Sequence, residues 1–422
     1  MSEFLISVVF ILSIIVLIGY FNEKVTKFTY EIVLMLFSVI IGAIILLINV
    51  IARDSSFSID ELRIIKMFNI EKFLMEGVLC FMLFAGSCHM RLLDFKKHAR
   101  PVSLLAILTT LLGAVFYGLL FFGAGKLLRL NLSLPVCLMF GSIIAPTDPI
   151  AATSILKKFN LPPNIGFIIE GESLLNDGVG VALFVCFSGM VSAQNHGNVV
   201  TIMLKELIGA IVVGAIISIL CFMLFKRTKD HTRQIFISLL AVSIAYVVCT
   251  YFEFSGAIAS VVCGVLFSAL RNHEEHKGNT LQLEQFDTFW EIADTLFNSI
   301  LYVLLGITFI RILKMPHALL LSLIAIVINF ISRSTSVGIS SLFMGKLPDS
   351  YNKFNFTKLL TWGGLRGGLS VALAMSTEGL VSNDTFYIIL GGVYAIVFFT
   401  TVIQGMTMKK VYLGIERSVN GK

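Results

Sequence analysis

The sequence carries little charge for its length. Only 14% of its 422 residues are Asp, Glu, Lys or Arg, whereas 57% are hydrophobic. Soluble globular domains have about 25% charged residues, so this composition excludes an ordinary soluble domain. The chain is therefore expected to be an all-α, polytopic membrane protein, with membrane lipid around it.

Paired cysteines are absent as well. The seven cysteines all fall within apolar segments and form no Cys-x-x-Cys motif. This pattern is typical of small buried hydrophobic residues and excludes disulfide frameworks and zinc ligands. No resident cofactor is expected. The net charge of +6 is explained by basic loops at one membrane face, so no nucleic-acid partner is implied.

Apolar stretches of about 18 or more residues predict membrane-spanning helices. Thirteen such stretches are expected, at residues 4–20, 29–51, 73–90, 102–124, 133–156, 164–191, 203–225, 234–251, 254–270, 287–310, 317–343, 357–377 and 385–408. The eighth and ninth are separated by so few residues that they could form one segment. An odd number of spans places the two termini on opposite sides.

The distribution of Lys and Arg predicts the orientation. Loops after the odd-numbered segments, with the C-terminal residues, hold more than twice as many basic residues as the opposite set. Because basic loops stay cytoplasmic, the C-terminus is expected inside and the N-terminus outside a cell (inner) membrane. The first segment has no basic residue before it, which argues against a cleaved signal peptide.

Two predicted spans are interrupted. Pro146 and Pro149 break the fifth, and Gly363–Gly368 loosens the twelfth. Interrupted helices at matching positions of inverted halves are typical of the substrate sites of transporters. We therefore expect a single transporter domain over 1–422, with a first six-helix repeat at about 1–191, a linker helix at about 203–225, a second repeat at about 234–408 and a short cytoplasmic tail at 409–422.

Acidic residues occur where lipid-soluble ones are expected. Each charge near the bilayer centre costs about 2.5 to 3.5 kcal/mol on an insertion scale, so such residues face partners, water or an ion. On the sixth segment, helical spacing places Ser173 and Asp177 on one face and Glu172 and Asn176 on the adjacent one. The carboxylates involved are Asp148, Glu170, Glu172 and Asp177, and the basic residues within spans are Arg333 and Arg366.

These residues suggest a site for a hard monovalent cation. Carboxylate oxygens of Asp148 and Asp177, the Ser173 hydroxyl and carbonyl groups near Thr147 could form an all-oxygen shell. Acids outnumber the two arginines, so protons or a cation must neutralise the excess. Burial disfavours a charged carboxylate, so cation and proton are expected to compete for the same aspartate.

Four motifs resemble those of monovalent cation/proton antiporters of the NhaP and sodium/proton exchanger type. They recur in order along nearly the whole chain, at Thr147–Pro149, Glu172–Gly178, Asn329–Arg333 and Trp362–Gly367. The resemblance implies a homodimer with crossed, interrupted fifth and twelfth helices. It also implies secondary exchange of sodium (or lithium) for protons by alternating access.

The same resemblance implies roles for individual residues. Asp177 would bind the ion and exchange the proton, helped by Asp148, Ser173 and the backbone at Thr147. Glu172 would pair with Arg333. Asn176 stands before Asp177 where related electrogenic antiporters have a second aspartate, which implies electroneutral exchange. Arg366 could offset the opposed helix ends of the crossed assembly or stabilise the empty site.

Other interpretations remain open at this point. A potassium/proton antiporter would have the same fold, because sequence does not give cavity size. An intramembrane aspartyl protease would also place two acids, Asp148 and Asp177, on neighbouring spans. The sequence around these two residues, however, lacks the Gly-x-Gly-Asp and Tyr-Asp signatures of such proteases. A passive channel would need a ring of ligands around a symmetry axis. Glu291 and Asp294, at one end of the tenth span, are expected to be solvated or capping residues.

Overall fold

The fold is known from a computed structural model. It describes residues 2–26, 29–51, 78–88, 100–148, 163–192, 199–276, 284–313, 318–345, 347 and 351–420. Within these residues all regular structure is helical, and the only β interaction is a single bridge between Glu378 and Val381. The expectation of an all-α protein is confirmed.

Most elements match the predicted spans closely. In the first half they are α1 (Ser2–Phe21), η1 (Asn22–Thr26), α2 (Tyr30–Ile51), α5 (Leu79–Cys88), η3 (Leu105–Thr109), α7 (Thr110–Leu127), α8 (Leu134–Ile144) and α10 (Pro163–Ser192). The second half holds α11 (Val199–Phe225), α12 (His231–Tyr251), α13 (Gly256–His276), α14 (Glu284–Leu313), α15 (Ala318–Phe343), α16 (Lys353–Trp362), α17 (Gly368–Met375), α18 (Asn383–Phe398), η4 (Phe399–Gln404) and α19 (Gly405–Asn420).

Length and hydropathy support a membrane protein. Eight of the described helices are long and apolar enough to cross a bilayer, and three further apolar helices are shorter. The short connection of Phe252–Ser255 separates α12 from α13, where Glu253 turns the chain with a φ of 58°. The eighth and ninth predicted spans are therefore separate helices. The total of thirteen and the inverted repeat stay predictions, because 52–77 and 149–162 lie outside the described residues.

Two predicted spans differ from simple helices. The fifth ends as a helix at Ile144, and its remainder beyond Asp148, including Pro149, is not among the described residues. The twelfth is divided into α16 and α17 by non-helical residues 363–367. At the C-terminal end, α19 runs to Asn420, so most of the predicted tail continues the helix of the last span.

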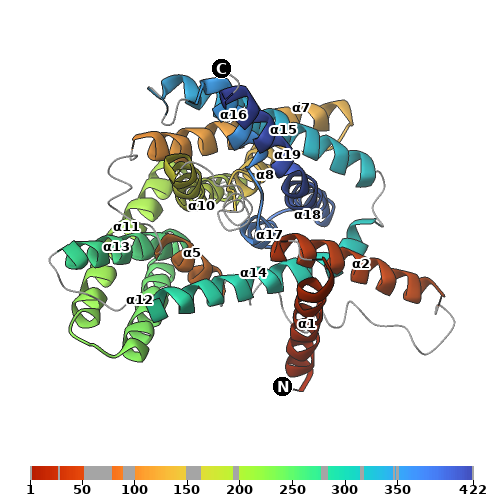
Figure 1. The fold of residues 1–422 in the computed structure, drawn as a ribbon. Coiled ribbons are helices and arrows are strands. Elements are labelled where there is room, and N and C mark those ends of the chain that lie inside the picture. The colour runs from red at the N-terminus through yellow and green to blue at the C-terminus, as the bar shows by residue number, and fades with distance from the viewer. Residues whose placement is uncertain are drawn as a thin grey trace.

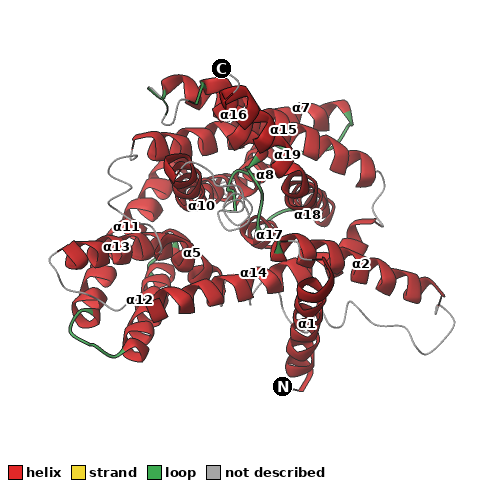
Figure 2. Cartoon of the chain, viewed as in Figure 1, coloured by secondary structure: helices red, strands yellow, loops and turns green. Residues whose placement is uncertain are grey.

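Two groups of helices lie on different sides of the interruptions. Helices α5, α11, α12 and α13 lie together on one side of the molecule, and α7, α15 and α16 lie on another, with α8, α10 and α17 between them (Figure 1). Figure 2 shows non-helical backbone in the middle of the helices, next to α8 and α17. Aromatic contacts of Phe84 and Phe267 stabilise the first group, and those of Tyr117 and Phe140 join α7 to α8.

Lipid-facing surface explains the many exposed apolar side chains. On α11, Ile208, Val212 and Ile216 are each about half exposed, at 57%, 49% and 53%. Such a stripe would be unfavourable in water but costs nothing against acyl chains. Several polar residues are instead buried at or near the two interrupted segments, among them Thr147, Ser173 and Arg366.

Candidate functional site

The two interrupted segments contact each other directly. The backbone N–H of Asp148 donates to the carbonyl of Leu365 at 2.8 Å. The Arg366 guanidinium donates to the carbonyls of Ala145 and Pro146 at 2.6 and 2.7 Å. Backbone groups freed by unwinding in a membrane must find partners in the protein, and here each interruption supplies them to the other.

Arg366 lies at the C-terminal end of α8, where the helix dipole favours a positive charge. Its side chain is 3% exposed and also donates to Asn329 of α15 at 3.3 Å. Two roles were considered for Arg366, and this geometry fits the first, in which its positive charge compensates the partial negative charge of a helix C-terminus. The guanidinium binds the carbonyls that α8 leaves without helical partners.

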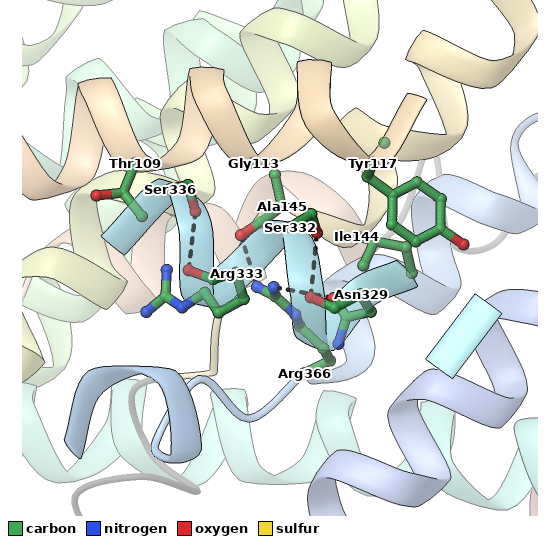
Figure 3. A pocket seen from close by; sticks show the side chains of 11 residues that line it. Thr109, Gly113, Tyr117, Ile144, Ala145, Asn329, Ser332, Arg333, Ser336 and Arg366 are labelled. Carbon is green, nitrogen blue, oxygen red and sulfur yellow. Dashed lines mark hydrogen bonds between the residues drawn. The ribbon is translucent and has the colours of Figure 1, made fainter. Parts of the chain in front are cut away.

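A pocket beside the Arg366 guanidinium is lined mostly by polar residues from four helical elements (Figure 3). Arg333, Ser332 and Ser336 come from α15, Thr109 and Tyr117 from η3 and α7, and Ala145 from the end of α8. Because two guanidinium groups line it, this pocket repels a cation. The predicted ion-binding side chains Ser173 and Asp177 come instead from α10, which does not line this pocket.

Asn176 connects α10 to the interruption after α8. Its Oδ1 accepts the Thr147 backbone N–H at 3.1 Å, and its Nδ2 donates to Thr147 Oγ1 at 2.7 Å. The hydroxyls of Thr147 and Ser173 are 2.8 Å apart. All three residues are buried. The structure thus brings together Thr147 and Ser173, two of the predicted ion-binding residues, and joins them to Asn176.

Glu172 and Arg333 form a buried ion pair between α10 and α15. Two hydrogen bonds join the guanidinium to both carboxylate oxygens, at 3.0 and 3.2 Å, and the side chains are 1% and 5% exposed. Glu172 also accepts from Asn176 at 3.0 Å. This bidentate geometry is the strongest form of a carboxylate–guanidinium contact, so the charge of Glu172 is already balanced.

Asp177 is in a different situation. It lies half-buried on α10, one turn beyond Ser173, within electrostatic range of Asp148, Glu172, Asp294 and Arg366. Within the described part of the chain, its carboxylate forms no hydrogen bond or ion pair. A carboxylate that shares an apolar interior with other acids and has no fixed partner there is suited to bind a mobile cation or proton.

Two glycines allow the close approach of these elements. A Cβ atom on Gly367 would collide with the Asp148 carboxylate, and one on Gly180 of α10 would collide with the ring of Pro146. Gly367 also immediately precedes α17, so Asp148 lies at the positive end of that helix. The last glycine of the Trp362–Gly367 motif is thus explained: any side chain at Gly367 would occupy the space of the Asp148 carboxylate.

Comparison with known proteins identifies the family. A family model described as the transmembrane sodium/hydrogen exchanger matches residues 9–413. The chain belongs to the sodium/hydrogen exchanger family. This exchanger is 29% identical over 375 residues to the Na⁺/H⁺ antiporter NhaP of Pseudomonas aeruginosa, covering 85% of this chain and 86% of that protein. It is 30% identical over 317 residues to NhaH of Halobacillus aidingensis, covering 72% and 75%.

A solved structure supports the fold of the exchanger. The sodium proton antiporter MjNhaP1 of Methanocaldococcus jannaschii superposes with a TM-score of 0.77, at 19% identity, over 98% of this chain and 99% of that one. The resemblance inferred from the four motifs is confirmed. Because the family consists of transporters, the chain is not an enzyme, and the intramembrane protease is excluded.

One expectation about the exchanger is wrong. Asp294 is not solvated but buried at 8% exposed on α14, where Asn298 donates to its Oδ2 at 3.2 Å. Glu291 is exposed, as expected. Tyr302 was not singled out at all, although its hydroxyl donates to Asp148 at 3.3 Å. Helical spacing could have indicated Tyr302 from the sequence, because Asp294, Asn298 and Tyr302 follow at intervals of four residues along one face of α14.

Proposed function

We propose that this exchanger moves sodium or lithium ions across the membrane in exchange for protons, with Asp177, Asp148, Ser173 and Thr147 as its ion-binding residues. The observation that carries the proposal is the carboxylate of Asp177, which has no partner among the described residues at the meeting point of the two interruptions. The names of the antiporter relatives given above agree with this function.

Competition between cation and proton follows from the charges. Arg333 balances Glu172, and Arg366 is engaged with backbone carbonyls, so neither guanidinium is free to neutralise Asp177. Two neighbouring carboxylates in an apolar interior cannot both stay charged without a positive partner. A bound sodium ion or a proton supplies that charge, and the arrival of one favours release of the other.

Alternating access completes the proposed mechanism. Because an ion trapped between the helices must reach both membrane faces, the elements around the two interruptions move relative to the remaining helices. The hydrogen bonds between Asp148 and Leu365 and between Arg366 and α8 keep the two interruptions together during this movement. Only the site occupied by a cation or a proton is expected to make the transition.

Transport by the purified protein in lipid vesicles tests the proposal. With a pH-sensitive dye inside, sodium and lithium gradients are expected to drive proton movement, whereas potassium is expected to drive far less. A response to potassium alone would replace sodium by potassium as the substrate. No cation-driven pH change with any of the three ions would contradict antiport.

Exchange is expected to be electroneutral. Asn176 is uncharged and uses its amide to hold Thr147 and Glu172, so only Asp177 of this pair can carry a proton. One sodium ion for one proton moves no net charge. The exchange rate in vesicles should therefore be the same at zero and at an imposed membrane potential set with potassium and valinomycin. A rate that changes steeply with the potential would contradict the stoichiometry.

The assembly and orientation are further parts of the proposal. We propose a homodimer in the cell membrane with the N-terminus outside and the C-terminus cytoplasmic, from the family resemblance and the distribution of basic residues. Maintenance of internal pH is the physiological role that such exchange supports best.

A further inference from the structure

Tyr302 contacts the carboxylate of Asp148, one of the proposed ion-binding residues. It is on α14 and is only 1% exposed, and its hydroxyl donates to Asp148 Oδ2 at 3.3 Å. Thr401 of η4 is a further hydrogen-bonding neighbour of the same hydroxyl. Tyr302 is therefore a contact of Asp148 with a helix outside the two interrupted segments.

The Asp148 carboxylate is held from several directions. Its backbone N–H is bonded to Leu365 at 2.8 Å, and Gly367 packs so closely that any Cβ there would collide with the carboxylate. The Tyr302 hydroxyl approaches from α14 and binds one oxygen. A hydrogen bond to Oδ2 disfavours a rotation of the carboxylate that would offer both oxygens to one ion.

A small pocket leads to this contact between α2 and α14. Asp148 and Tyr302 line it together with six other residues, most of which have oxygen atoms in their side chains: Tyr30, Glu31, Leu34, Thr295, Asn298 and Ser299. This pocket is separate from the one lined by the two arginines. An ion that approached Asp148 through it would pass the Tyr302 hydroxyl.

We propose that Tyr302 is a positioning residue that determines which alkali ion the site accepts. This inference rests on the proposed function. Carboxylates bind hard cations through one or both oxygens, and cavity size, ligand number and flexibility set the choice of ion. By holding Oδ2, Tyr302 keeps Asp148 a one-oxygen ligand in a compact shell, which suits sodium and lithium. Without the hydroxyl, the carboxylate turns and the shell widens enough for potassium.

Ion exchange by Tyr302→Phe tests the inference. We expect the KM for sodium to rise about tenfold, the effect of losing one hydrogen bond to a charged group. The KM for potassium should change less than about threefold and Vmax less than about twofold, because the ion is positioned differently but the transition between states is retained. The ratio of the two KM values is the decisive readout, since a merely structural role would not change it.

Tyr394→Phe is the matched control, because it removes the same atom from a buried tyrosine of α18 outside the site. It is expected to leave all KM values unchanged. Asp148→Glu is a second variant: it carries the carboxylate past the hydroxyl by one methylene and should lose discrimination against potassium in the same way.

Three results would overturn the inference. The first is unchanged discrimination in both Tyr302→Phe and Asp148→Glu while the wild-type protein exchanges sodium normally. The second is a loss of Vmax in Tyr302→Phe with unchanged KM values and a lower unfolding midpoint, which would make Tyr302 structural. The third is a wild-type protein that exchanges none of the three ions, which would contradict the proposed function as well.

Discussion

Replacing Asp177 by asparagine is expected to abolish ion exchange while leaving the fold intact. The amide cannot release a proton and offers a cation a neutral oxygen instead of a charged one. Loss of a buried charged ligand worth about 3 kcal/mol lowers the exchange rate about 100-fold or more. Sodium-driven pH change in vesicles measures the effect. Glu291→Gln, which neutralises an exposed acid on α14, is the control and should exchange at the wild-type rate.

Asp177→Asn is expected to keep or increase the stability of the protein, although it abolishes ion exchange. Asp177 has no partner in the described part of the chain and lies near Asp148, Glu172 and Asp294. Removing its charge relieves repulsion between like charges, so the unfolding midpoint in detergent without sodium should stay the same or rise. An inactive variant with a much lower midpoint would point to a structural role for Asp177. Full exchange by Asp177→Asn would contradict its proposed role as the exchange site.

Breaking the Glu172–Arg333 pair should produce the largest loss of stability. Removing one partner of a buried ion pair leaves the other charge uncompensated, at a cost of about 3 to 5 kcal/mol. Arg333→Leu and Glu172→Leu are each expected to unfold several degrees below the wild-type protein. The double variant should lose less than the sum of the two, because it leaves no unpaired charge. Thermal unfolding of the purified proteins in detergent measures all three.

An exposed ion pair provides the comparison. Arg233 and Asp230 approach to 3.2 Å at the start of α12, with side chains 75% and 48% exposed. Such pairs contribute about 0 to 1 kcal/mol, so Arg233→Leu should leave the midpoint almost unchanged. Equal losses in Arg233→Leu and Arg333→Leu, or additive losses in the double variant, would show that burial of the Glu172–Arg333 pair is not what stabilises α10 against α15.

The site residues that could be predicted from sequence are those whose side chains are unusual within an apolar membrane span. A charge within an apolar span is rare and costly, so Asp177, Arg333 and Arg366 stand out without any structure. The same applies to Pro146 inside a span, which marks the interruption after α8. The membrane class and the positions of the long helices follow from long apolar runs for a similar reason.

The residues that were missed or misjudged have side chains that are ordinary for their position. Tyr302 is an aromatic residue in an apolar helix, where most such residues are simply packed. Asp294 is near one end of the predicted tenth span, where a carboxylate is usually solvated, and only the folded arrangement shows that it is buried well inside α14. The division of the twelfth span into α16 and α17 was indicated by its glycines, but the contact of that break with Asp148 could not be deduced from spacing.

Proton release on sodium binding is the most direct test of the central claim that one buried site holds a cation or a proton in turn. Addition of sodium to the purified exchanger in weakly buffered detergent solution should release about one proton per ion bound, and Asp177→Asn should release none. Sodium binding without proton release across the pH range in which the protein exchanges ions would contradict the account.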